Sequence, residues 1–383
     1  MHATEKITSL AQAIEFFQRT MAARPERDGL ASDRAVIEGR WRKHPVLYIG
    51  HNALPTDPDR PASEFDLPGV EMPETPEASL ARDIVGMLAP LKLLNPVRAA
   101  FGLGRGTGSL VPSFGIPLNP DAGHSPACTI TLDQALAQDP PCPETSGLIP
   151  GMRERPELIK DRTPAWFRIG PPDMQGPYNI AHAVIGEDAL IAPYTNPDGF
   201  HEFMGRVTRF WIETHRSIAA WIGRDRLPPM EQSFVRIAEC SCNLISRAMY
   251  REFVLPYDTR IGETFGPMQI HTCSGPHVFH ETLDLLPDVR CSEAGFIAKT
   301  AAGYTPVDEA LAAIGGRPII LHIGQELPAG KAYETIRNDI DTCADHPRMY
   351  VGSYTGMHRR NRDTPMICKM HRDLDDYWAR KFA

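Results

Sequence analysis

A histidine and a cysteine lie two positions apart in Ile270-His271-Thr272-Cys273-Ser274-Gly275, where a short apolar run predicts a strand that ends at a Gly-Pro turn. Because side chains alternate between the two faces of a strand, His271 and Cys273 are expected on the same side. One imidazole and one thiolate suit Zn²⁺, which favours nitrogen and sulfur ligands in tetrahedral geometry. The spacing predicts a zinc site at this strand end, and a buried, inert pair is the alternative.

Further ligands are needed, because a catalytic zinc takes about three protein ligands and keeps one open position. Glu293 ends the next predicted strand and offers oxygen, and His358 follows the last predicted strand and offers nitrogen. Cys291 lies on the same strand face as Glu293 and competes with it. Cys240 and Cys242 also follow a strand and could complete the site without His358, with plain packing of buried thiols as the alternative.

Two carboxylates at strand ends are expected to do catalytic work. Glu239 follows the apolar run Phe234–Ala238 and is expected to act as a general acid or base, or to orient a zinc-bound imidazole. A salt bridge to an arginine is the alternative. Asp173 is expected to move protons or position substrate, and Gln175 to bind substrate, because Gly176 lets a ligand approach closely. A purely structural turn is the alternative there.

Short apolar runs alternate with helical patterns from the middle of the chain onward. The predicted strands are Pro45–Gly50, Ser109–Phe114, Trp166–Gly170, Gln232–Ala238, Met268–His271, Asp288–Ser292, Pro318–Ile323 and Met349–Ser353. The predicted helices include residues 4–24, Pro197–Ile222, Ser246–Phe265, Gly275–Leu286, Thr305–Ile314 and Lys331–His346, and residues 52–80 and 116–145 are predicted loops. Eight strands with crossover helices predict an α/β fold, a parallel (β/α)8 TIM barrel, although an open doubly wound sheet gives the same alternation.

A barrel places its site where the strands end, so Asn52 after the first strand and Tyr354 after the last are expected to bind substrate. The chain has 383 residues, of which 42% are hydrophobic, which is enough for a large core. We therefore predict one barrel domain over residues 1–383, with an N-terminal helical extension over residues 1–44.

Composition excludes several classes of partner. The net charge is −8 and no basic tract carries interleaved aromatics, so nucleic acid is not expected. No stretch approaches 18 apolar residues and the N-terminus lacks a signal-peptide pattern, so we expect no membrane span and a cytoplasmic location. The eight cysteines are then expected to be reduced.

Three further stretches carry a resemblance to a known family: Gly170-Pro171-Pro172-Asp173-Met174-Gln175-Gly176-Pro177-Tyr178-Asn179-Ile180-Ala181, Leu244-Ile245-Ser246 and Phe253-Val254-Leu255-Pro256-Tyr257. Together with His271-Thr272-Cys273-Ser274-Gly275, they resemble the uroporphyrinogen decarboxylase-like superfamily over roughly residues 100–380. This resemblance implies a (β/α)8 barrel with its site at the mouth.

Within that superfamily the chain is more similar to the zinc-dependent methylcobamide:thiol methyltransferase branch, which holds zinc with a His-x-Cys and a distant cysteine. The first two ligands correspond to His271 and Cys273. The distant cysteine belongs to a Gly-Cys-Gly-like turn, where this chain has Tyr354-Thr355-Gly356-Met357-His358-Arg359, so His358 takes its place. The decarboxylases carry an arginine-rich segment after the first strand, which Val46-Leu47-Tyr48-Ile49-Gly50-His51-Asn52 lacks.

The resemblance implies a Zn²⁺ enzyme that moves a methyl group between a small molecule or thiol and a corrinoid (cobalamin) carried on a partner protein. It is also compatible with a homodimer. One alternative is a metal-free decarboxylase or lyase on the same barrel, with Asp173 and Glu239 as acid and base and with Arg168, Arg236 or Arg359 binding a carboxylate. Another is a non-catalytic barrel that only binds a ligand.

Overall fold

The computed structural model describes residues 6–40, 47–49, 67–104, 106–119, 125–272, 276–296, 307–323, 329–342, 344–346, 349–353 and 364–383. Two compact units can be distinguished, and each is built from separate stretches of chain. The first comprises Met1–Phe101, Arg162–Phe167 and Gly295–Ala383, and the second comprises Gly102–Asp161 and Arg168–Ala294. The single barrel domain with its extension over residues 1–44 stays a prediction.

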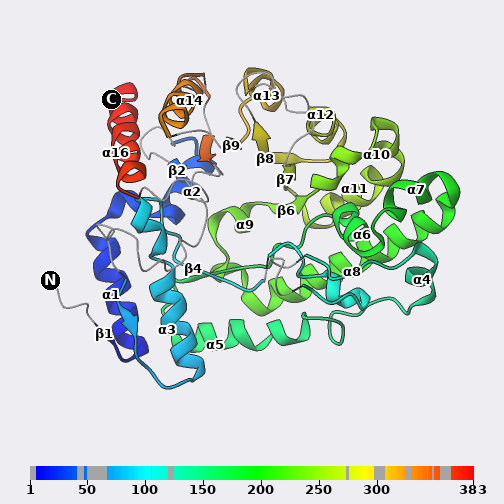
Figure 1. Ribbon diagram of the computed structural model, residues 1–383, viewed down its shortest axis with the longest axis horizontal. Coiled ribbons are helices and arrows are strands. Elements are labelled where there is room, and N and C mark those ends of the chain that lie inside the picture. The colour runs from blue at the N-terminus through cyan, green and yellow to red at the C-terminus, as the bar shows by residue number, and fades with distance from the viewer. Residues whose placement is uncertain are drawn as a thin grey trace. The chain divides into compact units, whose positions relative to one another are not determined.

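The first unit combines helices with short parallel strands (Figure 1). Its helices are α1 (Leu10–Ala22), α2 (Gly29–Ile37), α3 (Pro76–Gly86), α13 (Val307–Ile314), α14 (Ala329–Thr342) and α16 (Thr364–Lys381). Strand β1 (Lys6–Ile7) pairs with β3 (Gly69–Val70), and β2 (Leu47–Ile49), β10 (Met349–Ser353) and β9 (Ile319–Ile323) run parallel in the order β2-β10-β9. Helix α1 starts where the side chain of Ser9 accepts a hydrogen bond from the Gln12 amide, which satisfies one of the free donors of the first turn.

The described part of the second unit contains nine α-helices and three parallel strands in one sheet. Its helices are α4 (Leu132–Ala137), α5 (Glu154–Arg162), α6 (Pro177–Ile185), α7 (Asp188–Thr195), α8 (Pro197–Ile222), α9 (Pro229–Ser233), α10 (Arg247–Phe253), α11 (Leu255–Phe265) and α12 (Pro276–Leu285). Its strands are β6 (Val235–Ala238), β7 (Met268–Thr272) and β8 (Val289–Phe296), which extends past the unit boundary, and they lie in the order β6-β7-β8. Strand β4 (Ala100–Gly102), at the other boundary, pairs with β5 (Arg168–Gly170).

Helix α8 forms the largest part of the core of the second unit. It begins at Asn196, whose side chain accepts from the Gly199 amide, and ends at Gly223, whose positive φ of 83° favours glycine. Its buried face includes Phe203, Val207, Phe210 and Trp211, which recur at helical spacing. Each such side chain contributes about 1.5–3 kcal/mol when fully removed from water.

The register of the three strands sorts their side chains into a polar and an apolar face. Arg236 pairs with Gln269 and Ala238 with His271, and a β-bulge between β7 and β8 then sets His271 opposite Glu293. Paired residues of parallel strands point to the same side, so the functional side chains share one face. The apolar face carries Ile237 and Ile270, with helix α11 packed against β6 and α12 against β7.

Seven of the eight predicted strands are present: β2, β5, β6, β7, β8, β9 and β10. The remaining predicted strand, Ser109–Phe114, is wrong, because Val111–Phe114 forms a 3₁₀ helix. Pro112 has no backbone donor for a ladder, and Gly115 ends the turn at a positive φ of 77°. The structure therefore shows a mixed helix and strand fold, and the described strands do not form a closed barrel.

The two predicted loops are wrong in part. Residues 76–86 form α3, which starts at Thr75 because its side chain accepts from the Ala78 amide. Residues 132–137 form α4, which begins with a capping box between Thr131 and Gln134. Across the described part of the chain, we find no helix of the length and apolarity that a membrane crossing requires.

Candidate functional site

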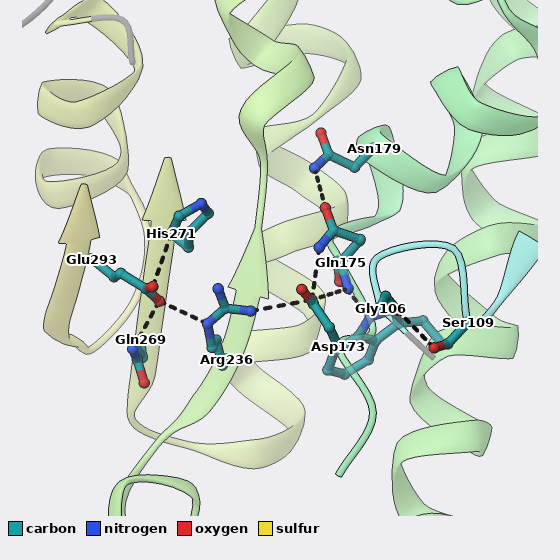
Figure 2. A network of polar contacts seen from close by, with 10 residues as sticks. Gly106, Ser109, Asp173, Gln175, Asn179, Arg236, Gln269, His271 and Glu293 are labelled. Carbon is teal, nitrogen blue, oxygen red and sulfur yellow. Dashed lines mark hydrogen bonds and ion pairs between the residues drawn. The ribbon is translucent and has the colours of Figure 1, made fainter. Parts of the chain in front are cut away.

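The centre of the site is Glu293, which gathers three polar side chains on the polar face of β6, β7 and β8. Its Oε2 accepts hydrogen bonds from Arg236 Nε at 2.8 Å and from Gln269 Nε2 at 3.3 Å. Its Oε1 lies 3.3 Å from His271 Nδ1 (Figure 2). Because Glu293 is almost fully buried, this arrangement fixes the position of the carboxylate and its histidine neighbour.

Arg236 extends the network to the strand end of β5. Its Nη1 lies 3.2 Å from Asp173 Oδ1, so one guanidinium serves two carboxylates. The side chains of Arg236 and Asp173 are 30% and 31% exposed, which leaves this part of the network accessible to a small molecule. Charge-assisted bonds of this kind are shorter and stronger than neutral ones.

Gln175 holds Asp173 from the other side. Its Nε2 donates to Asp173 Oδ1 at 2.7 Å, and its backbone has φ of 56°, which non-glycine residues rarely adopt. The indole of Trp211 donates to the Gln175 carbonyl at 2.9 Å and fixes this backbone conformation. Outliers of this type often occur where a ligand is bound.

The Asp173 turn also packs against the preceding glycine-containing segment. The Leu103 amide donates to the Gly170 carbonyl at 3.2 Å. A Cβ on Gly104 would lie 2.6 Å from Pro172 Cβ, so a larger residue there would displace the turn. The turn is therefore held by close backbone packing on one side and by Trp211 on the other.

Helix α6 contributes Asn179, which the sequence analysis missed. Its Nδ2 donates to Gln175 Oε1 at 2.7 Å, and its Oδ1 accepts from the Ser241 amide at 2.7 Å. Ser241 Oγ in turn lies 3.0 Å from His182 Nδ1. Asn179 stands in the family-like stretch around Asp173, and its position one turn beyond Gln175 was the signal that could have identified it.

Glu239 lies in a different environment, fully buried at the first turn of α6. Its Oε1 accepts from the Tyr178 amide at 3.1 Å and its Oε2 from the Asn179 amide at 3.0 Å. A carboxylate in this position satisfies free helix donors and faces the positive end of the helix dipole. Burial raises the pKa of Glu239, whereas the two amides lower it.

The predicted site residues therefore fall into three groups. Asp173, Gln175, His271 and Glu293 belong to one network, and Glu239 lies beside that network under α6. Asn52, Tyr354, Cys273 and His358 are outside the described residues. No group of three or more His, Cys, Asp or Glu side chains able to hold a metal is found among the residues that the structure does describe.

The alternative cysteine ligands are also placed. Cys242 is fully buried, with Sγ 3.9 Å from Glu239 Oε2, and burial raises the pKa of its thiol well above the usual value. Cys291 is fully buried and Cys240 is half-buried.

Comparison with known proteins places the fold but not a family. No family model and no curated protein matches the sequence. Among solved structures, the chain is similar to a methyltransferase from Methanosarcina mazei, with a TM-score of 0.55 and 13% identity over 77% of this chain and 84% of that one. A protein described as a vitamin-B12-independent methionine synthase from Listeria monocytogenes matches with a TM-score of 0.38 and 9% identity over 59% of this chain and 69% of that one. At this identity, the first likeness shows a shared fold and nothing more, and the second is too weak to carry an argument.

Proposed function

We propose that this protein is a zinc-dependent methyltransferase that moves a methyl group between a small molecule or thiol and a corrinoid. The observation that carries the proposal is the contact of His271 with Glu293, supported by the fold shared with a methyltransferase. The proposal includes a closed (β/α)8 barrel of the uroporphyrinogen decarboxylase-like type, of which β6, β7 and β8 would form part.

The described residues fit a zinc ion at His271. Metal-bound histidines usually face a carboxylate with the ring nitrogen that does not bind the metal, and Glu293 stands in that position at Nδ1. The contact favours a proton on Nδ1 and leaves Nε2 as the ligand atom. Cys273, and His358 in place of a third thiolate, would complete the set.

Glu293 has two roles open to it, and the structure favours one. The sequence suggested Glu293 as a ligand, yet Oε2 is held by Arg236 and Gln269, and Oε1 faces His271. We therefore assign Glu293 the task of orienting His271. Zinc bound here would supply a Lewis acid that lowers the pKa of an acceptor thiol.

Asp173 and Gln175 would bind and orient the substrate. Asp173 is half-exposed, keeps Arg236 as a counter-charge, and can accept a proton at Oδ2, since the described contacts of its carboxylate all involve Oδ1. The amides of Gln175 and Asn179 offer neutral hydrogen bonds nearby. Asn52 and Tyr354 are proposed to contact the same substrate, and the corrinoid would be carried on a partner protein.

Zinc analysis tests the proposal directly. Purified protein should contain about one equivalent of zinc, and His271→Ala and Cys273→Ala should lose it. Cys128→Ala is the matched control, because Cys128 is exposed and free. Active protein without metal would contradict the proposal.

Turnover separates methyl transfer from the alternatives. With methylcobalamin and a panel of thiols, the absorbance of methylcobalamin should decrease, and the decrease should require His271. Release of CO₂ from aromatic or porphyrinogen acids by protein free of zinc would instead favour the decarboxylase or lyase. Tight ligand binding without any turnover would favour the non-catalytic barrel.

His358 has its own test, because it replaces a thiolate of the family pattern. His358→Ala should weaken zinc binding, whereas His358→Cys should retain the metal, since either side chain can be a zinc ligand. Unchanged zinc affinity in His358→Ala would remove this residue from the ligand set.

A further inference from the structure

Two buried carboxyl groups in the second unit have no part in the proposed chemistry. Glu239 follows β6 and Asp258 lies on α11, and both are fully removed from solvent. Neither forms an ion pair with an arginine or lysine within the described residues. The side chains around them are Cys242, Tyr178 and Tyr250, which are neutral. Burial of an uncompensated charge is costly, so Glu239 and Asp258 together can carry at most one negative charge.

Hydrogen bonding decides which carboxyl holds the proton. The carboxyl groups of Glu239 and Asp258 lie within reach of each other, and two buried carboxyls in such proximity must share a proton. Glu239 already accepts from two backbone amides, one at each oxygen. Both oxygens of Asp258 have no donor within the described residues. The arrangement is satisfied when Asp258 donates and Glu239 accepts three hydrogen bonds.

The same pair determines where the first turn of α6 lies. Glu239 binds the Asn179 amide, and the Asn179 side chain binds Gln175, which in turn binds Asp173. Gly176 makes this possible, because a Cβ there would lie 2.0 Å from Glu239 Oε1. A continuous series of hydrogen bonds thus runs from Glu239 to the partly exposed Asp173.

We propose that Asp258 is permanently protonated and donates to Glu239, and that this buried acid pair positions α6 and, through Asn179 and Gln175, the Asp173 carboxylate. Asp258 and Glu239 are then positioning residues and not catalytic ones. The inference goes beyond the proposed function, because it holds for any reaction at Asp173. Burial and the neighbouring Glu239 both raise the pKa of Asp258, which agrees with this state.

Exchanging each acid for its amide tests the assignment. Asp258→Asn keeps a donor toward Glu239, so urea unfolding and amide hydrogen exchange at Tyr178 and Asn179 should stay close to wild type. Glu239→Gln places an NH₂ group against the backbone N–H donors of Tyr178 and Asn179, so hydrogen exchange at these two amides should accelerate about tenfold or more. The reverse pattern, a mild Glu239→Gln and a severe Asp258→Asn, would overturn the proposal.

A spectroscopic measurement keeps the test valid if a variant fails to fold. Infrared spectra of the wild-type protein near neutral pH should contain the C=O band of a buried protonated carboxyl, and Asp258→Asn should lack it. Tyr250→Phe is the control, because this buried hydroxyl has no hydrogen-bond partner among the described residues. The control should keep the band, and a wild-type spectrum without any such band would refute the inference.

The link to the site has a readout of its own. The side-chain amide resonances of Gln175 and Asn179 and the Nε–H resonance of Arg236 should shift in Glu239→Gln, but not in Asp258→Asn or Tyr250→Phe. A Glu239→Gln variant that folds and leaves all three resonances in place would show that the pair does not position Asp173.

Discussion

Arg236 and Glu239 are three residues apart at the end of β6, yet they belong to polar groups of opposite kinds. Around Arg236, two carboxylates share one cation, and one of them, Asp173, is partly open to solvent. Around Glu239, two carboxyls meet without a cation and are sealed from solvent. In the first group a cation lies between the two carboxylates, whereas in the second group a proton takes the place of the missing cation.

This difference separates the residues that can meet a ligand from those that hold the framework. The accessible network around Arg236 can exchange one of its hydrogen bonds for a bond to substrate. The buried pair of Glu239 and Asp258 can contact only other residues of the chain. Replacing residues in each group should therefore have different consequences for stability and for metal binding.

The largest expected effect comes from Arg236→Leu. It leaves Asp173 and the mostly buried Glu293 without their shared cation, and should lower the free energy of unfolding by about 2–3 kcal/mol, somewhat less than for a fully buried pair. Urea unfolding measures this. Arg236→Lys keeps the charge but not both bonds and should be intermediate, while an unchanged stability in Arg236→Leu would show that the network is not formed.

Gly176→Ala should destabilise the protein at the buried pair of Glu239 and Asp258. The added methyl would occupy the place of Glu239 Oε1, and the loss should be about 1–3 kcal/mol in thermal or urea unfolding. Gly86→Ala near the end of α3 is the matched control, because nothing lies within 4 Å of the added atom. Equal behaviour of the two variants would mean that Glu239 does not pack against Gly176.

Zinc affinity should distinguish the groups most clearly. Glu293→Gln should weaken zinc binding about 10–100-fold, as expected when the carboxylate that orients a metal-bound histidine is lost. Asp258→Asn should leave the affinity unchanged. Competition with a chromophoric chelator measures both, and a similar loss in the two variants would show that Glu293 and Asp258 do not belong to separate groups.

The smallest expected effect is a dependence of stability on pH that comes from His215. Burial keeps this imidazole neutral. Burial lowers its pKa from 6.5 to about 4, and its ring stacks on Trp211 with centroids 5.2 Å apart. Because the unfolded chain binds this proton more readily, stability should be complete above pH 6.5 and fall as the pH decreases toward 4. We expect a loss of about 1–2 kcal/mol, reduced because the ring is partly accessible.

Unfolding at several pH values checks this, with His215→Phe as the variant that should lack the dependence on this group. A wild-type protein whose pH dependence is identical to that of the variant would show that His215 is protonated equally easily in both states.

The elements were largely predictable because their patterns are local. Helix α8 lies at its predicted bounds of Pro197–Ile222, since capping and a long apolar face act within the segment itself. The segment around Pro112 shows where such reasoning fails, because an apolar run resembles a strand until the missing backbone donor is considered. His271 was selected from its His-x-Cys spacing at a strand end and Glu293 from the end of the next strand, and the structure brings the two side chains together.

The interactions between elements were not predictable in the same way. Arg236 appeared only as an arginine that could bind a carboxylate, whereas its partners come from the turn after β5 and from β8, distant in sequence. Asp258 has the appearance of an ordinary polar residue of an amphipathic helix, and only tertiary packing shows that it is buried. Sequence pattern encodes which face of an element is apolar, but not which polar residue of one element meets that of another.

The β-bulge between β7 and β8 carries a last consequence. Met268 pairs with Val289, but Gln269 pairs with Cys291, so Arg290 is the extra residue that turns Glu293 toward His271. If Arg290 were instead paired with Gln269 in regular order, Ser292 would stand opposite His271, and a hydroxyl would take the place of the carboxylate. A shift of the pairing by a single residue at this point would therefore change the side chain opposite His271 while every residue of the sequence stays the same, so the bulge, and not the sequence motif alone, determines which group meets the histidine.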